Sequence, residues 1–183
     1  MQTVRKKVRF TYQDYLLLPY DKRYELIEGD LHRVPAPLTN HQKVSRNLQR
    51  ILWEFVQKNG LGEVLYAPVD VVLSSEDVVQ PDILFIAKER LAILTEKNVR
   101  AAPDLVIEIL SPSSKEWDLE IKRKLYEKYG VREYWIVDPE AQTVEVLQLT
   151  DDGYLAFRVF SRGTKLKSPL LKDFSFPIEA IFG

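Results

Sequence analysis

The chain has 183 residues, of which 45% are hydrophobic and 29% charged, and its formal net charge at pH 7 is -1. A chain of this length and composition can bury a sizeable core, so we expect one domain spanning residues 1–183. It has no cysteine and 2 histidines, which excludes disulfides and thiolate metal sites and disfavours a histidine-built zinc site. Any bound metal would therefore use oxygen ligands, as magnesium and manganese do.

The sequence also indicates where the protein is located and what it could bind. The basic start of the chain, Met1 to Arg9, lacks the apolar core of a signal peptide, and no apolar run is long enough to span a bilayer. We therefore expect a cytoplasmic protein. Because the chain has no basic excess, binding to nucleic acid would need local basic patches.

Helix and strand signals alternate along the first half of the chain. Residues 11–18 predict a short capped helix that Pro19 ends, and residues 23–34 predict a β-hairpin around a Glu-Gly-Asp turn. Apolar residues recur at helical spacing from His41 to about Lys58, where Asn59-Gly60 ends the helix. Strands are then predicted over residues 63–74 and 78–87, with a short amphipathic helix over residues 88–100.

The segment from Pro103 to Gly130 carries the most informative pattern. Leu105 to Leu110 is a buried strand with one acid, Glu108, inside it, and a buried carboxylate needs a cation or hydrogen bonds. Ser113 and Glu116 fit a capping box that would begin a helix. That helix places Asp118, Lys122, Tyr126 and Tyr129 on one face, since they are spaced by four, four and three residues.

The last third of the chain reads as strands. Residues 133–138 form a strand that Pro139 ends, and residues 142–150 and 154–161 form a hairpin across Asp151-Asp152-Gly153. The tail, residues 170–181, is apolar enough to pack back on the body. No repeat or flexible linker interrupts the chain.

Two predicted strands each carry an acid in an apolar context, Asp82 and Glu108. Two carboxylates that lie close together repel, and either one proton or a divalent cation relieves the repulsion. Magnesium is often held by two carboxylates, with waters and phosphate oxygens as its other ligands. Lys122 would stabilise charge on a phosphate. These parts suit metal-assisted hydrolysis of a phosphodiester.

The order of motifs resembles the PD-(D/E)XK nuclease superfamily, and more closely its Uma-two family of restriction-endonuclease-like proteins. The matching segments are YELIEGDL at Tyr24 to Leu31, HQKV at His41, VVQPDILFI at Val78 to Ile86, PDLVIEILSPSS at Pro103 to Ser114, DLEIKRKLY at Asp118 to Tyr126 and GVREYWIVDP at Gly130 to Pro139. They cover nearly the whole chain in the family's order.

The resemblance implies an α/β (α+β) fold with a central mixed β-sheet flanked by helices and additional β-hairpins. It implies a magnesium- or manganese-dependent endonuclease acting on DNA, in which Asp82 and Glu108 bind the metal and Lys122 assists. The superfamily's lysine lies two residues after the acid, where this chain has Leu110; Lys122 instead comes from the following helix. Further pocket positions under the resemblance are Glu28, Gln80, Tyr126 and His41.

Other interpretations of the same residues stay open. Glu108 would also be satisfied by pairing with Lys122 or Arg123 without a metal, and Asp82 by capping a turn after Pro81. The chain would then be a catalytically silent nuclease-fold protein that binds nucleic acid or acts as a scaffold. Glycoside hydrolysis by the paired acids is a third class, but it leaves Lys122 without a role. Cutting both strands of a duplex with one site per chain favours a homodimer, with the apolar hairpin over residues 142–161 as its interface.

Overall fold

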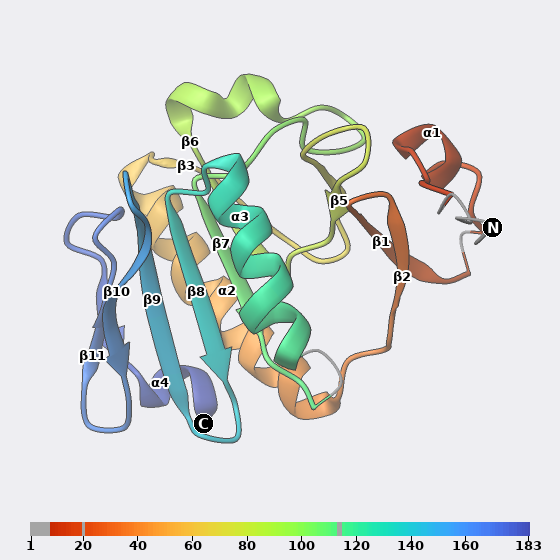
Figure 1. Cartoon of the computed structure of the whole chain (residues 1–183). Helices are drawn as coiled ribbons and strands as arrows, with labels where there is room; N and C mark the ends of the chain where they lie inside the picture. Colours follow the sequence, from red (N-terminus) through yellow and green to blue (C-terminus); the bar gives the residue numbers. More distant parts are fainter. Residues whose placement is uncertain (1–7, 20, 113–114) are drawn as a thin grey trace.

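The centre of the molecule is a six-stranded mixed β-sheet (Figure 1), seen in a computed structural model that describes residues 8–19, 21–112 and 115–183. Its strands are β3 (Gly62–Tyr66), β6 (Ile83–Ala87), β7 (Leu105–Ile109), β8 (Glu133–Asp138), β9 (Thr143–Thr150) and β10 (Gly153–Phe160). They lie in the order β10-β9-β8-β7-β6-β3. β7 and β8 pair in parallel, whereas the other neighbours pair antiparallel. The predicted mixed sheet is confirmed.

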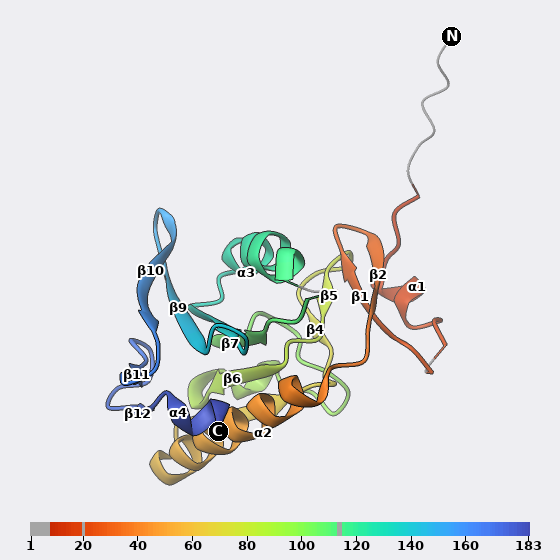
Figure 2. The ribbon, with the colours of Figure 1, turned by 90° about the horizontal axis from the view of Figure 1, so that it is seen from below.

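Helices cover both faces of this sheet (Figure 2). The long helix α2 (Thr39–Asn59) lies against one face and ends at Gly60, whose φ of 59° is left-handed, as the Asn-Gly pair predicts. The other face is covered by the crossover between β7 and β8, which consists of the π-helix η2 (Trp117–Lys122) and the helix α3 (Arg123–Tyr129). Among the described residues, no helix has the length and apolar character needed to cross a membrane.

A second, four-stranded sheet lies beside the main one (Figure 1). It consists of β1 (Arg23–Ile27), β2 (Asp30–Val34), β4 (Val71–Val72) and β5 (Val78–Val79), in the order β2-β1-β5-β4. β1 and β2 form the predicted hairpin, whose turn holds Glu28 and Gly29 at positive φ. The short helix α1 (Tyr12–Tyr15) joins this sheet, since the Tyr12 amide donates to the Ser75 carbonyl at 2.7 Å.

The remaining elements lie on connections and at the C-terminal end. They are the 3-10 helix η1 (Lys88–Ile93), the strands β11 (Lys165–Lys167) and β12 (Ser175–Pro177), and the helix α4 (Glu179–Phe182). α4 lies beside α2, where the Asn47 side chain donates to the Ile181 carbonyl at 3.3 Å. The apolar tail therefore packs back on the body, as its composition predicts.

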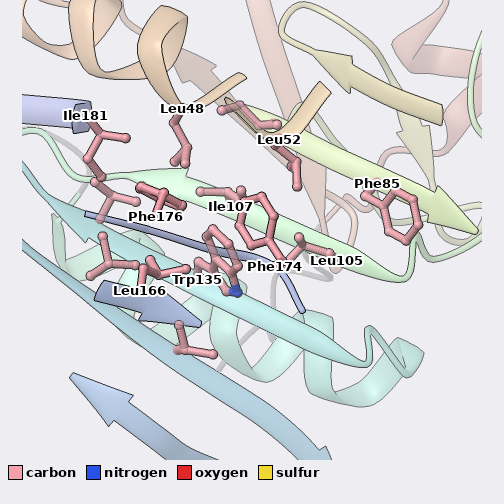
Figure 3. Packing of buried hydrophobic residues seen from close by; sticks show 14 of the residues in the cluster. Leu48, Leu52, Phe85, Leu105, Ile107, Trp135, Leu166, Phe174, Phe176 and Ile181 are labelled. Atoms are coloured by element: carbon pink, nitrogen blue, oxygen red, sulfur yellow. The ribbon is translucent and has the colours of Figure 1, made fainter. Parts of the chain in front are cut away.

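The core has two layers because both faces of the main sheet are covered. Leu105 and Ile107 lie on the α2 side with Leu48 and Leu52, and Trp135, in the same cluster, lies beside Phe174 (Figure 3). The alternate residues Val106 and Tyr134 belong to the cluster under α3. Burying one such side chain contributes about 1.5–3 kcal/mol, so apolar packing against the sheet is the main interaction that holds both helices in place. Glu108, two residues after Val106, shares the α3 side of its strand.

Two of the predicted strands are each divided in two. Residues 63–74 yield β3 and β4, with Pro68 between them, and residues 78–87 yield β5 and β6, with Pro81 between them. Proline lacks the donor that a central strand needs, so the chain leaves one sheet and enters the other at these points. The predicted helix over residues 88–100 is likewise shorter, because η1 ends at Ile93 and Leu94 bridges to Val99.

Candidate active site

Asp82 and Glu108 are brought together by the pairing of β6 with β7. Ile83 lies opposite Ile107 in this antiparallel pair, so Asp82, immediately before β6, lies next to Glu108. The Ile109 amide donates to Asp82 Oδ2 at 2.8 Å and fixes that carboxylate against β7. Asp82 thus directly follows Pro81, at the point where the chain passes from the second sheet into β6.

Lys122 is buried among three carboxylates. Its Nζ lies 3.0 Å from Glu25 Oε1, 3.0 Å from Glu108 Oε1 and 3.5 Å from Asp118 Oδ1. Only about 5% of Lys122 is exposed. Burial disfavours the charged amine, but the three carboxylates outweigh burial and raise the pKa of Lys122 well above its usual value. Lys122 is thus a fixed positive charge on one wall of the site.

Glu108 is held from two sides. Tyr126 on α3 donates its hydroxyl to Glu108 Oε1 at 2.6 Å, and the Lys122 ammonium donates to the same oxygen. Burial raises the pKa of Glu108 well above its usual value, Lys122 partly offsets that, and the nearby Asp118, Asp82 and Glu25 carboxylates add to the rise. An additional cation at this place would relieve the crowding of negative charge.

The lysine reaches the site from the π-helix η2. Asp118 and Lys122 still form the ion pair expected four residues apart, although the turn is wider than an α-helical one. The Asp118 carbonyl accepts a bond of 3.1 Å from the Tyr134 hydroxyl on β8. This bond ties the wide turn to the sheet. The predicted capping residue Ser113 lies outside the described residues.

His41 and Asp82 form a second polar pair. His41, in the first turn of α2, places Nε2 3.0 Å from Asp82 Oδ2. Because a carboxylate oxygen only accepts, Nε2 carries the proton in this contact. His41 Nδ1 is buried and has no hydrogen-bond partner within the part of the chain that the structure describes. His41 and the Ile109 amide thus both contact Asp82 Oδ2.

Gln80 links the site to the second sheet. Its backbone N–H donates to Glu25 Oε1 at 2.8 Å, and its side-chain oxygen accepts from Arg23 Nε at 2.8 Å. Its side-chain nitrogen donates to Asp70 Oδ1 at 2.8 Å. The residue just before the Pro81 break thereby holds Glu25 and Arg23 of β1 at the rim of the site.

These side chains surround a small polar cavity of about 60 Å³. Hereafter it is called the active-site cavity. Its walls are Arg23, Val34, Pro35, Ala36, Pro37, His41, Gln80, Asp82, Glu108, Ile109, Ser111, Asp118 and Lys122.

Most of the residues predicted from the sequence meet here, and one does not. Asp82, Glu108, Lys122, Gln80 and His41 line the active-site cavity, and Tyr126 lies behind Glu108.

Glu28 lies elsewhere. It is exposed in the turn after β1 and lines a separate hollow with Ile121 and Lys124. Glu25 takes the place expected for Glu28, because the two lie three residues apart and point to opposite sides.

The donor set suits a hard divalent cation that completes its coordination with substrate. Asp82 and Glu108 line one cavity, and the described contacts of each carboxylate use one oxygen, Oδ2 and Oε1 respectively. Across the described residues there is no group of three or more acids and histidines arranged to hold a metal by itself. The residues therefore fit a two-carboxylate magnesium site, not an all-protein cage.

The mixed sheet, with acids on two neighbouring strands and a lysine from the crossover helix, defines a restriction-endonuclease-like protein. Its fold is similar to a solved structure described as a "putative nuclease belonging to DUF820" from Anabaena variabilis ATCC 29413, with a TM-score of 0.78. The two sequences are 22% identical, and the match covers 94% of this chain and 97% of that one.

The sequence itself places the chain in a family. The profile of the Uma2 family, described as "Putative restriction endonuclease", matches residues 12–179. The chain belongs to this family. No curated protein is detectably similar to it.

Proposed function

We propose that the protein is a magnesium- or manganese-dependent endonuclease that hydrolyses DNA phosphodiester bonds at the active-site cavity. Membership of a restriction endonuclease family supports a nuclease. The observation that carries the finer proposal is that two acids and a buried lysine, Asp82, Glu108 and Lys122, line one polar cavity. In this proposal, Asp82 and Glu108 hold the cation and Lys122 assists.

Each residue has a role that follows from its contacts. Asp82 is oriented by the Ile109 amide and by His41, so its position is fixed before substrate arrives. Tyr126 orients Glu108 in the same way. Lys122 supplies a fixed positive charge toward the cavity, where it would stabilise negative charge that develops on the phosphate. A bound cation would polarise the phosphate and neutralise part of its charge.

The experiment is cleavage of a supercoiled plasmid with magnesium or manganese present. Asp82→Asn and Glu108→Gln keep the side-chain shapes but remove the charges that hold the cation. We expect each variant to lose activity by on the order of a hundredfold or more. Glu28→Gln is the matched control, since Glu28 is an exposed acid outside the cavity, and it should cut as the wild type does. Unchanged cleavage by both site variants would reject the assignment.

One observation favours a second function, a nuclease fold that binds nucleic acid without cutting it. Lys122 lies 3.0 Å from both Glu25 and Glu108, so its charge is already balanced by acids of the chain. In that case oligonucleotide binding would weaken with salt, as phosphate contacts require, while magnesium would produce no turnover. Magnesium-dependent cleavage that Glu108→Gln abolishes would exclude this alternative.

We also infer that the protein acts as a homodimer through the β9–β10 hairpin. β10 is an edge strand, and Leu155, Phe157 and Val159 on it are 59%, 47% and 54% exposed. An open edge with apolar side chains is a site for pairing with another strand, and a second copy offers the same edge in two-fold symmetry. Two cavities in one assembly would allow both strands of a duplex to be cut.

A further inference from the structure

A larger cavity adjoins the active-site cavity. It measures about 230 Å³ and shares four wall residues with the active-site cavity, namely Val34, Pro35, Asp118 and Lys122. Hereafter it is called the flanking cavity. Because Lys122 belongs to both walls, a ligand group in the flanking cavity would lie next to a group bound at Glu108.

Two aromatic rings form one wall of the flanking cavity. Trp117, the first residue of η2, and His32 on β2 have ring centroids 4.1 Å apart at an interplanar angle of 48°. The two rings come from different layers of the fold, and both are partly exposed. A partly exposed aromatic ring beside a polar site, such as that of Trp117, is a surface on which the bases of nucleic acids stack.

The charges around the flanking cavity suit a nucleotide. Arg33, next to His32, is exposed at this cavity, and Lys122 lies on the shared wall. Glu25 and Asp118 also line it, but both lie within ion-pair distance of Lys122, at 3.0 Å and 3.5 Å. The lysine thus offsets part of the repulsion that these acids would exert on a phosphate, and Arg33 adds a second cation.

We propose that the flanking cavity binds one unpaired nucleobase, stacked on Trp117 with His32 beside it, of a DNA strand whose phosphate occupies the active-site cavity. The proposal rests on the proposed nuclease function for the identity of that phosphate. A base inside a duplex is already stacked and paired, so it reaches such a pocket only from a single strand or after extrusion. The cavity is smaller than the about 300–1,000 Å³ of pockets for drug-sized ligands, which suits one base. A single-stranded oligonucleotide should therefore bind more tightly than the matched duplex, from which a base must first be extruded.

Intrinsic fluorescence tests the stacking directly. The chain has 3 tryptophans, of which Trp53 is 45% exposed and Trp135 is fully buried. In a Trp53→Phe background, quenching would report mainly on Trp117. The protein is titrated with a single-stranded oligodeoxynucleotide of 12 nucleotides, in EDTA so that no DNA is cut. Its binding should quench the tryptophan emission saturably. The matched duplex should bind more weakly. Equal or tighter binding of the duplex, or saturable binding without quenching, would overturn the proposal.

Substitutions at the wall give an independent reading by fluorescence anisotropy of a labelled oligonucleotide. Trp117→Leu should weaken single-strand binding by on the order of tenfold, whereas Trp117→Phe, which keeps a stacking ring, should stay close to the wild type. Trp53→Leu is the control, because Trp53 lies on α2 away from the cavity. Circular dichroism checks that Trp117→Leu folds, and if it does not, the quenching measurement on folded protein decides. Wild-type affinity in folded Trp117→Leu would reject the subsite.

The two proposals fail in different ways. If Asp82→Asn abolishes cleavage while Trp117→Leu leaves both affinity and cleavage unchanged, the subsite is wrong and the nuclease stands. If the wild type never cuts but Trp117-dependent quenching is seen, the nuclease is wrong and the base-binding cavity stands.

Discussion

The ammonium group of Lys122 lies within 3.5 Å of three carboxylates, those of Glu25, Glu108 and Asp118. Asp82, immediately before β6, lies next to Glu108. If all four acids are ionised, Lys122 offsets only one of their four negative charges. Such an excess is costly in a buried place, and a divalent cation removes it. A proton on Glu108 removes part of this excess as well, since burial raises the pKa of that carboxyl, and the cation is the relief that we propose.

Removing the lysine charge should destabilise the fold. Lys122→Met keeps the length of the side chain but leaves Glu25, Glu108 and Asp118 without their common partner. Breaking a buried ion pair from one side costs about 3–5 kcal/mol, so we expect the free energy of unfolding to fall by about that amount. Urea denaturation measures it, with Lys124→Met as control, because Lys124 is an exposed lysine in the adjoining helix α3. A change below about 0.5 kcal/mol would show that the acids are satisfied without Lys122.

The sequence predicted the residues that come from the main sheet and its crossover helix. Asp82 and Glu108 were visible because each is an acid in an apolar strand, and Lys122 because it shares a helix face with Asp118. Glu25 was missed as a site residue since its contact with Lys122 joins the second sheet to the crossover helix η2, and no pattern within residues 23–34 shows which acid turns inward. The orphaned nitrogen of His41 could not be foreseen either, because it results from packing.

At the level of elements, Asp77 fastens the second sheet to α3. Its carboxylate accepts from the Glu28 amide at 2.8 Å, from Ser74 at 3.0 Å and from the Tyr129 hydroxyl at 2.5 Å. Burial would raise the pKa of Asp77, but these hydrogen bonds and the nearby Lys128 outweigh it and lower the pKa below its usual 3.8. Because β1 carries Glu25, this contact also helps to position the site.

Asp77→Asn should lower the free energy of unfolding by an amount that depends on pH, because it removes the charge of the Asp77 carboxylate. A lowered folded-state pKa means that the stabilisation is present above the usual pKa of 3.8 and is lost as pH falls through the lowered folded-state value. We expect the variant to be less stable than the wild type by about 1–3 kcal/mol at pH 7. The difference should shrink toward pH 2. Thermal melts across pH 2–7 measure it, and a difference that does not change with pH would contradict the role of the carboxylate charge.

Element types were predicted well where a local rule decides them, and less well where two sheets compete. The end of α2 at Gly60 and the hairpin turn at Glu28 and Gly29 follow from local backbone preferences. The division of residues 63–74 and 78–87 does not, because it depends on which sheet each half joins. The π-helical turn at η2 could not be predicted from local sequence either, since the hydrogen bond from Tyr134 to the Asp118 carbonyl is a tertiary contact.

At the scale of the whole molecule, the two edges of the main sheet differ. The edge strand β10 carries several exposed apolar side chains, Leu155 and Phe157 among them, whereas the opposite edge strand, β3, carries the exposed Tyr66. If β10 forms the dimer interface, Phe157→Lys should convert a dimer into a monomer, because it places a charge in an apolar contact. Sedimentation velocity at micromolar concentration measures the mass. Tyr66→Lys is the control and should remain dimeric, and a monomeric wild type would remove the dimer from the account.

Calorimetric titration of manganese tests the central claim most directly, namely that Asp82 and Glu108 hold a divalent cation for phosphodiester hydrolysis. The titration is made with an uncleavable phosphorothioate oligonucleotide present, so that the substrate can complete the coordination. We predict saturable binding by the wild type that Asp82→Asn and Glu108→Gln each abolish or weaken by on the order of a hundredfold. Binding that is absent in the wild type, or equal in the wild type and both variants, would contradict the account.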